Sequence, residues 1–233
     1  MRSDTEWRGQ SGAILDAFAR SVARKGYDGT SFTIIASELG ISRGLIAHHF
    51  GTKERLLATL HVSYMKRRVS EGLRIVAALP TPAEQLAGLL FASILYQVHD
   101  RDATVVFQRE VARFAREADD SEGRKLRNEY AGILRDVINA GIASGEFRNI
   151  DAKIRSLLVF GSAHWAWTWF RPDGELTAEQ IGAELVDLVV GSLLVTRRRL
   201  ARIADPEGEI VATVQAILTG EHLADRKANM ATA

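Results

Sequence analysis

The segment 31–53, SFTIIASELGISRGLIAHHFGTK, constrains the fold more than any other part of the chain. It contains two short helical patterns separated by a glycine. Ser31 or Thr33 can cap the first helix, and Gly40 supplies the left-handed residue that ends it at little conformational cost. Ser42 then offers a side-chain oxygen to the first N–H groups of a second helix. A short helix, a glycine turn and a second short helix predict a helix-turn-helix.

The second helix of this motif has an apolar side and a small, polar side. Ile46 and Phe50 are four residues apart, so they share one face and can point into a core. The residues left on the other face are Arg43, Gly44, Ala47 and His48. In a helix-turn-helix the second helix enters the major groove of DNA, where its N-terminal residues meet base edges. The motif therefore predicts binding to double-stranded DNA. The alternative is a corner of the same shape in an enzyme.

Helical periodicity continues through the rest of the chain, and no segment alternates in the way of a strand. The clearest helix start is at Thr81, which caps, with Pro82 at the first helical position and Glu84 completing a capping box. The expected helices cover residues 8–25, 31–39, 43–49, 52–79, 81–99, 103–118, 121–145, 151–169, 177–200 and 207–218. We expect an all-α fold of about ten helices, with a three-helix head at residues 1–52 and a larger helical body at 53–233.

Composition sets few limits on this 233-residue chain. The net charge is +1, and residues 1–55 hold eight Lys and Arg against six Asp and Glu, so DNA binding has to rest on where charges and helix N-termini lie. The absence of cysteine excludes disulfides and thiolate chemistry. Apolar stretches such as 185–195 are too short to cross a bilayer, and no signal pattern is present at the N-terminus. We expect a cytoplasmic protein with no membrane partner.

The first fifty-odd residues resemble the TetR family of bacterial repressors. The matching segments are Gly26 to Ser31, Ile35-Ala36, Gly40 to Gly44, His48 to Phe50, and Lys53-Glu54 leading into Leu56-Leu57. The resemblance implies a homodimer that binds a palindromic operator through paired heads. It also implies a small-molecule effector in the body that spreads the heads and releases the DNA. We therefore expect a ligand-responsive transcriptional repressor.

By this resemblance the DNA-binding residues are Thr33, Ser42, Arg43, Gly44, Leu45, Ala47, His48, His49 and Lys53. Ser42 and the free N–H groups behind it suit a phosphate, because a helix N-terminus carries partial positive charge. Arg43 can reach a phosphate or pair with guanine, and Leu45 can contact a thymine methyl. Many family members have tyrosine where this chain has Ala47, so the phosphate contact of that hydroxyl is missing here.

The sequence indicates neither a metal site nor an enzyme. His48 and His49 are adjacent, so on a helix they point about 100° apart, and no acidic or cysteine partner lies near them in the sequence. The chain also lacks a spaced set of carboxylates and histidines and a glycine-rich phosphate loop. We expect no metal, no cofactor and no catalytic residue.

Aromatic residues of the body are the candidates for an effector pocket. The phrase Trp-Thr-Trp-Phe-Arg-Pro-Asp-Gly at 167–174 is similar to that of TetR members that respond to acyl-CoA thioesters. The predicted ligand-binding residues are Phe91, Leu95, Phe107, Arg109, Tyr130, His164, Trp165 and Trp169. Two other interpretations stay open. Trp165 and Trp169 share one helix face and can cage a cationic or quaternary-amine ligand, or the protein can bind DNA without any effector.

The helices at 151–169 and 177–200 carry the expected dimer interface. Small residues among apolar ones let helices of two subunits approach closely, and in TetR proteins the last two body helices usually pair in this way. The predicted interface residues are Leu157, Gly161, Leu185 and Leu188. Arg197 to Arg199, at the end of the second helix, are expected to complement its dipole, with a second DNA contact as the alternative.

Overall fold

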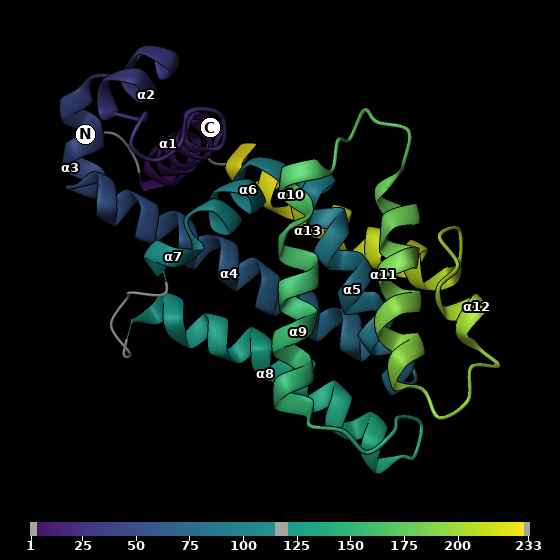
Figure 1. Cartoon of the computed structure of the whole chain (residues 1–233). Coiled ribbons are helices and arrows are strands. Elements are labelled where there is room, and N and C mark those ends of the chain that lie inside the picture. The colour runs from purple at the N-terminus through teal and green to yellow at the C-terminus, as the bar shows by residue number, and fades with distance from the viewer. Residues whose placement is uncertain (1–3, 115–120, 231–233) are drawn as a thin grey trace.

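The computed structural model describes residues 4–114 and 121–230, and within them the chain is all α-helical, as predicted (Figure 1). The only strand-like pairing in these residues is an isolated bridge between Phe147 and Leu194. Ten of the helices have eight or more residues, and three have four. In chain order the helices are α1 (Asp4–Lys25), α2 (Phe32–Leu39), α3 (Arg43–Phe50), α4 (Lys53–Ala78), α5 (Pro82–His99), α6 (Arg101–Arg109), α7 (Val111–Phe114), α8 (Glu122–Ala143), α9 (Ala152–His164), α10 (Ala166–Trp169), α11 (Ala178–Leu193), α12 (Leu200–Ile203) and α13 (Glu209–Met230).

Helices α1, α2 and α3 form the head, which lies at one end of the long helix α4 (Figure 1). The predicted caps are present, because the Ser31 side chain accepts a hydrogen bond from the N–H of Ile34 and Ser42 accepts one from that of Leu45. Gly40 ends α2 with a φ of 65°, which a residue with a side chain rarely adopts. The head core contains fully buried residues from these three helices and from the start of α4, namely Ile14, Phe18, Ile35, Ile46 and Leu56.

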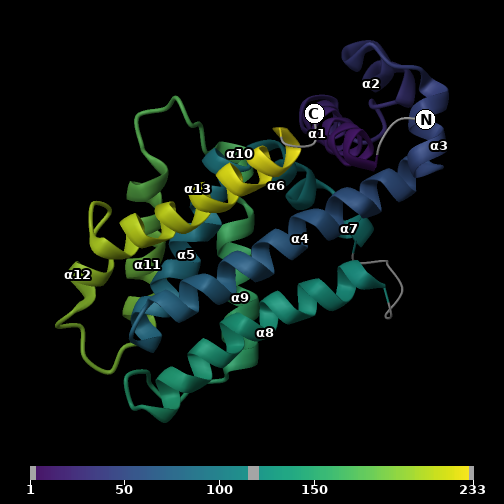
Figure 2. The same ribbon diagram turned by 180° about the vertical axis from the view of Figure 1, so that it is seen from behind.

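Helix α4 joins the head to the body. Thr52 caps it, and its 26 residues span about 39 Å. Its first turns contribute Leu56 and Leu57 to the head core, while Ile75 near its other end belongs to the body core. Figure 2 shows α4 running from the head into the body. The predicted domain boundary between residues 52 and 53 therefore falls at the start of a continuous helix that takes part in both cores.

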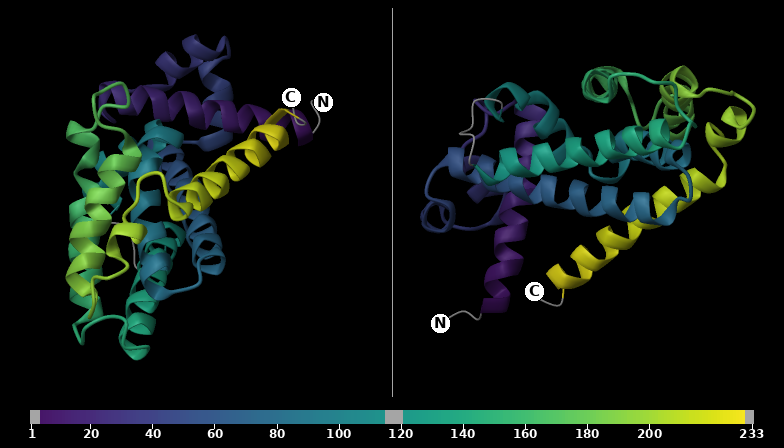
Figure 3. Two further views of the ribbon diagram at one scale, coloured as in Figure 1. Left: turned by 90° about the vertical axis from the view of Figure 1, so that its right-hand side faces the viewer. Right: turned by 90° about the horizontal axis from the view of Figure 1, so that it is seen from below.

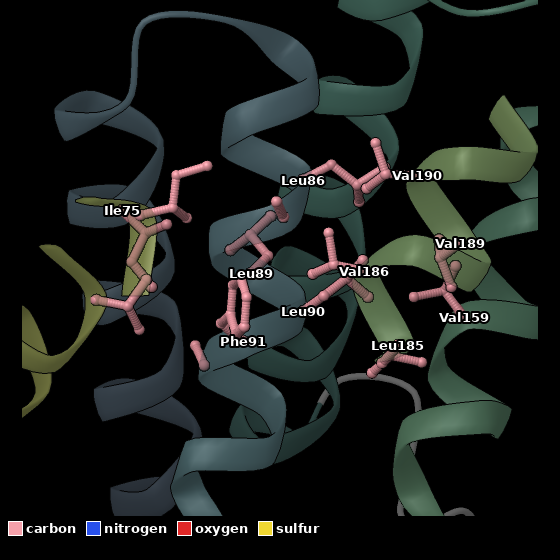
Figure 4. Packing of buried hydrophobic residues seen from close by; sticks show 14 of the residues in the cluster. Ile75, Leu86, Leu89, Leu90, Phe91, Val159, Leu185, Val186, Val189 and Val190 are labelled. Atoms are coloured by element: carbon pink, nitrogen blue, oxygen red, sulfur yellow. The ribbon is translucent and has the colours of Figure 1, made fainter. Parts of the chain in front are cut away.

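The body is built around α5, which is buried along almost its whole length. Helix α11 packs along α5, and Figure 4 shows Leu90 of α5 beside Val186 of α11. Gly182 permits this approach, because a Cβ atom there would lie 2.5 Å from the ring of Phe91. Helices α4 and α8 lie side by side and also contact α5, so the body consists of helices packed around one central helix (Figure 2).

Two predicted helices are interrupted in the structure. The helix expected at 103–118 starts at Arg101 and gives way to α7 after Arg109, and residues 115–118 lie outside the described part of the chain. The helix expected at 151–169 divides at Trp165 into α9 and α10. Helical periodicity continues across both breaks, so apolar spacing alone did not show them.

The helix expected at 177–200 ends earlier, at Leu193. The N–H of Arg148 donates to the carbonyl of Leu193 over 2.8 Å, and the N–H of Val195 donates to that of Glu146 over 3.0 Å. These bonds to a distant loop replace the next helical turn. Arg197 to Arg199 therefore lie in the connection between α11 and α12. The guanidinium of Arg197 still lies beside Gly191 in the last turn of α11, as the predicted complement of the dipole requires, whereas Arg199 pairs with Glu84 of α5.

The last helix, α13, is longer than the predicted 207–218 and runs from the far end of the body back toward the head (Figure 3). It packs against α5 and α4 and contacts α1. The side chain of Arg74 in α4 donates to the carbonyl of Ile217 over 3.0 Å. Among residues 209–220, the part of α13 whose side chains the structure describes, the buried apolar residues are Ile210, Val211, Val214 and Leu218. Among the residues searched, no helix has the length and hydropathy needed to cross a membrane.

Candidate nucleic-acid interface and ligand cavity

The first turn of α3 presents polar and small groups to solvent. Ser42, Arg43 and Gly44 are all exposed, and Ser42 Oγ accepts from the N–H of Leu45 over 3.1 Å. Beside Gly44, the Ser42 hydroxyl is the one neighbouring atom that a Cβ would meet within 4 Å. A DNA backbone can therefore come close to the start of this helix.

The other residues predicted to bind DNA lie around this first turn. Thr33 is exposed near the start of α2, and His48 is exposed near the end of α3. Leu45, Ala47 and His49 are half-buried. Burial and the neighbouring His48 lower the pKa of His49, which keeps that ring neutral. Within the residues that were searched, no group of three or more His, Cys, Asp or Glu side chains can hold a metal ion.

Lys53 has a role in the head that the sequence did not reveal. Its Nζ donates to the carbonyl oxygens of Tyr27 and Thr30, both over 3.0 Å, and lies 4.1 Å from the centre of the Tyr27 ring. The Tyr27 hydroxyl donates to Oε1 of Glu54 over 3.0 Å. Burial and this carboxylate raise the pKa of Tyr27. Lys53 and Glu54 thus hold the loop that leads into α2, and they fix the position of that helix.

Two arginines of the body also contact the head. Arg113 of α7 pairs with Asp28 over 3.1 Å and lies over the Tyr27 ring at 4.4 Å. Arg109 of α6 donates from Nη1 to the carbonyl of Ala23 over 3.0 Å. The chain segment between α5 and α8 therefore links the body to the loop that precedes α2.

A cavity of about 390 Å³ lies in the body between α4, α5, α6, α8 and α9. Most of its wall is apolar, and the residues of this kind include Met65, Leu89, Leu90, Leu134, Val159 and Phe160. Figure 4 shows Leu89, Leu90 and Val159 among the buried side chains of the body. A wall of this kind with a few polar groups is typical of small-molecule sites.

The predicted ligand-binding residues are divided between this cavity and other places. Phe107 and Tyr130 line the cavity. Phe91 and Leu95 are buried in the body core, outside the lining, and Arg109 contacts the head. Trp165 and Trp169 are 66% and 52% exposed and do not line the cavity. The side chain of His164 lies outside the described residues. Periodicity marks which face of a helix is buried but not which part of that face borders a cavity.

A buried ionic cluster lies against the cavity, and sequence reasoning missed it. Arg68, 2% exposed, pairs with Glu71 over 2.9 Å and with Asp100 over 3.4 Å, and Arg67 pairs with the same Asp100 oxygen over 2.8 Å. The Arg68 guanidinium also lies 3.8 Å from the centre of the Tyr96 ring. The spacing of Arg68 and Glu71 on α4 was a visible signal, but their partner Asp100 is far away in the sequence.

The pKa values around this cluster follow from burial and charge. Burial disfavours the charged form of Arg68, but Tyr96, Tyr64 and the two carboxylates together raise its pKa above the usual value. Burial is the main cause that raises the pKa of Tyr64, Tyr96 and Tyr130. Arg68 therefore carries its charge, and the three tyrosines remain protonated.

The predicted dimer residues lie mainly on an exposed apolar surface. Leu157 on α9 and Leu188 on α11 are 64% and 65% exposed. Gly161 is exposed and has no atom within 4 Å of the place where a Cβ would be. Leu185 is buried in the body core. The other large exposed apolar residues of α9 and its C-cap are Ile154, Leu158 and Trp165.

Comparison with known proteins identifies the family. Residues 14–60 match the family described as bacterial regulatory proteins, tetR family, and residues 80–193 match the tetracyclin repressor-like C-terminal domain. The chain belongs to the TetR family. This TetR-family protein is thus a DNA-binding transcriptional regulator with a helix-turn-helix, and the prediction that it is not an enzyme is confirmed. Helices α12 and α13 lie beyond the second match.

Relatives of known structure share this fold. The transcriptional repressor KstR2 of Mycobacterium tuberculosis is 29% identical over 183 residues, which cover 78% of this chain and 92% of KstR2. The structure of this ketosteroid transcriptional regulator superposes with a TM-score of 0.69 over 80% of this chain and 96% of that one. AibR, solved in complex with isovaleryl coenzyme A and operator DNA, is 26% identical, with a TM-score of 0.68 over 77% of this chain and 97% of AibR.

Proposed function

We propose that this TetR-family protein is a homodimeric repressor that binds a palindromic operator and releases it when an acyl-CoA thioester occupies the body cavity. In this proposal residues 1–52 are the DNA-binding domain and residues 53–233 hold the effector and the dimer interface. The observation that carries the effector class is the apolar cavity, together with the related AibR, which binds isovaleryl coenzyme A. The volume of the body cavity, about 390 Å³, lies within the usual range for small-molecule sites.

The exposed start of α3 supports the proposed operator contacts. Ser42 and the N–H groups of the first turn suit a phosphate oxygen, because the helix dipole is positive there. Arg43 is exposed and forms no hydrogen bond or ion pair within the part of the chain that the structure describes. Its guanidinium can therefore pair with a phosphate or with guanine. Lys53 uses its ammonium to hold two carbonyls of the head, which makes it a positioning residue for α2 as well as a nearby positive charge.

The position of the cavity supports a coupling between effector and operator. Its wall includes Tyr64 and Met65 of α4, and the same helix contributes Leu56 and Leu57 to the head core. An effector that binds more tightly to one position of α4 therefore shifts α4 toward that position. The head moves with it, because the first turns of α4 are part of the head core. Operator and effector then bind with negative coupling, because each prefers a different spacing of the two heads.

The exposed apolar side of α9 supports the homodimer. Exposed apolar patches on a folded chain mark interaction surfaces. A two-fold axis places the same surface of two subunits against each other. Such a contact would remove Leu157, Leu158 and Leu188 of both copies from water. The two-fold axis then places two heads on two half-sites of a palindromic operator.

The proposal is tested with full-length protein and an operator selected from random duplexes. Sedimentation should give a dimer, and anisotropy should show that octanoyl-CoA weakens operator binding whereas coenzyme A alone does not. Leu134→Trp, which fills the cavity, should remove the response to octanoyl-CoA and leave operator binding intact. A monomer, or an operator affinity that no acyl-CoA from four to eighteen carbons changes, would contradict the proposal.

A further inference from the structure

Helix α6 lies between the cavity and the head. Phe107 and Gln108 of this helix line the cavity. α6 also packs along α1, and within the described part of the chain it does so more extensively than any other body helix (Figure 1). Ala103 and Val106 of α6 are buried in the same cluster as Phe18 of α1. One body helix therefore forms both a wall of the proposed effector site and the main support of α1.

Phe107 belongs to an aromatic layer that α4, α6 and α7 share. Its ring stacks on that of Tyr64 of α4, with the ring centres 5.0 Å apart, and it lies 5.8 Å from the ring of Phe114 of α7. Phe114 in turn stacks on His61 of α4 at 3.9 Å. Packed interiors have low compressibility and transmit displacements. A ligand that pushes on Phe107 from the cavity therefore shifts α6 and α7 relative to α4.

The loop at 26–31, which leads into α2, is held from two sides. On one side Lys53 of α4 donates to two of its carbonyls. On the other side Arg113 of α7 pairs with Asp28 over 3.1 Å and lies over the ring of Tyr27. The two supports belong to different helices, so a displacement of α6 and α7 from α4 cannot preserve both of them.

Arg109 adds a second contact on the side of α6. Its Nη1 donates to the carbonyl of Ala23 over 3.0 Å. Its Nη2 would lie 3.2 Å from a Cβ atom at Gly26, so the guanidinium packs directly on the turn that ends α1. Arg109 is two residues from Phe107, within one helical turn, so the two residues move together.

The strength of these contacts suits a reversible change. Arg109 and Arg113 are both exposed, and so is Asp28. Exposed ion pairs contribute little stability. A ligand can shift an equilibrium only by the difference between its affinities for the two states, and breaking weak contacts requires only a small difference.

We infer that an effector in the cavity releases the loop at 26–31 inside each head, because it displaces Phe107, and with it α6 and α7, from α4. This inference rests on the proposed acyl-CoA response and names its transmitting residues. Phe107 contacts the ligand, and Arg109 and Arg113 transmit the displacement to the loop. A released loop changes the position of α2, which packs on α3. If the head only moved with α4 as a rigid body, the loop would keep all of its contacts.

Hydrogen exchange of the wild-type dimer without DNA tests the inference directly. Saturating octanoyl-CoA should raise the exchange rates in peptides covering residues 26–36 by about tenfold, because a local opening becomes easier when one of two supports is lost. Peptides from α11, which is remote from the head, should show no increase. A rigid movement of the head would leave the exchange of residues 26–36 unchanged.

A double variant removes the transmitting contacts without altering the cavity wall or α3. Arg109→Met combined with Arg113→Met leaves the loop supported by α4 alone. The measured quantity is the coupling factor, the ratio of operator dissociation constants with and without saturating octanoyl-CoA. This factor should fall by about tenfold, because the loop is already released before the ligand binds. For the same reason octanoyl-CoA should bind the free variant at least as tightly as the wild type.

Arg20→Met is the matched control. It removes an exposed ion pair of similar geometry, Arg20 with Glu38 at 2.8 Å, which joins α1 to α2 inside the head. No residue of α6 or α7 takes part in this pair, so the coupling factor should equal that of the wild type. If the double variant does not fold, hydrogen exchange of the wild type decides the question by itself.

The possible results distinguish the inference from the function on which it rests. If octanoyl-CoA releases the operator but exchange in residues 26–36 does not rise, the head moves as a rigid body, so the inference is wrong and the proposed function stands. A folded double variant that keeps the wild-type coupling factor also overturns the inference. If no acyl-CoA binds to dimer that still binds the operator, the acyl-CoA proposal fails, and the inference fails with it.

Discussion

The two halves of α4 keep their charges in opposite environments. In the head, Lys53 is half-buried and Glu54 is exposed, and both bond to the loop before α2. In the body, Arg68 and Glu71 are each 2% exposed and pair with one another. One helix therefore carries a polar cluster beside solvent at one end and an ionic cluster in the interior at the other.

This difference separates the two tasks of a TetR-family regulator. Charges at a surface are hydrated, so they can exchange water for phosphate at little cost, and their mutual pairing contributes little stability. Charges in an interior have to be satisfied by fixed partners, because a buried charge that loses its partner is strongly destabilising. The head is thereby suited to a salt-dependent contact with DNA, and the body to a selective contact with a small molecule.

The largest expected effect comes from breaking the interior cluster. Glu71→Ala leaves Arg68 without its main partner, and the free energy of unfolding should fall by about 3–5 kcal/mol in a urea titration. The matched control is Glu122→Ala, which removes the exposed pair of Glu122 with Lys66 at 2.7 Å. That change should lower the free energy of unfolding by less than about 1 kcal/mol. Equal losses for the two variants would remove the contrast between the two regions.

The next effect concerns operator binding and leaves the body unchanged. Arg43→Ala should weaken operator affinity by about ten- to a hundredfold, because one guanidinium contact to a base or phosphate contributes about 1–3 kcal/mol. Arg171→Ala, which removes an exposed arginine of the body, is the control and should have no effect on this affinity. Fluorescence anisotropy at several salt concentrations measures both. An unchanged affinity for Arg43→Ala would exclude the assigned role of α3.

An effect of similar size is expected from the charge that holds the loop before α2. Lys53→Met removes the donor to the carbonyls of Tyr27 and Thr30. The free energy of unfolding should fall by about 2–4 kcal/mol, since two hydrogen bonds from a charged donor are lost, each contributing about 1.5–3 kcal/mol, and the half-buried ammonium is partly screened by water. Hydrogen exchange should increase in residues 26–36 and stay the same in α11. If operator affinity falls while this exchange is unchanged, Lys53 acts as a direct phosphate contact and not through α2.

The smallest effect is expected at a pair on the surface of the head. Arg20 and Glu38 join α1 to α2 over 2.8 Å, and both side chains are about two-fifths exposed. A double-mutant cycle with Arg20→Ala and Glu38→Ala should give a coupling energy of about 0.5 kcal/mol. A value above about 2 kcal/mol would show that surface charges of the head contribute as much as buried ones.

The sequence was sufficient wherever both partners of an interaction lie within one turn. Ser31, Gly40 and Ser42 each act on atoms within four residues along the chain, and the structure has all three caps where they were predicted. Thr81 and Thr177 both accept from the N–H three residues on, where α5 and α11 begin. At Thr177 the side chain of Gln180 completes the capping box, whereas the carboxylate of Glu84 accepts from the Thr81 hydroxyl, so the box predicted at Thr81 is only half formed. Local chemistry of this kind also accounts for the all-α fold and for the head.

What only the tertiary structure decided depends on residues far apart in the chain. α11 ends at Leu193 because the loop at 146–148 binds its last carbonyl, and nothing near residue 193 signals this. Trp165 and Trp169 share a spacing that fits a pocket, but α10 turns them outward.

The helix-turn-helix was thus determined by short-range hydrogen bonds and backbone preferences that a sequence displays directly. The cavity and the ionic cluster beside it were not. Arg68 meets Asp100 only after α4 and α5 pack together. Interior electrostatics depend on the three-dimensional arrangement of partners, and the order of residues along the chain does not specify that arrangement locally.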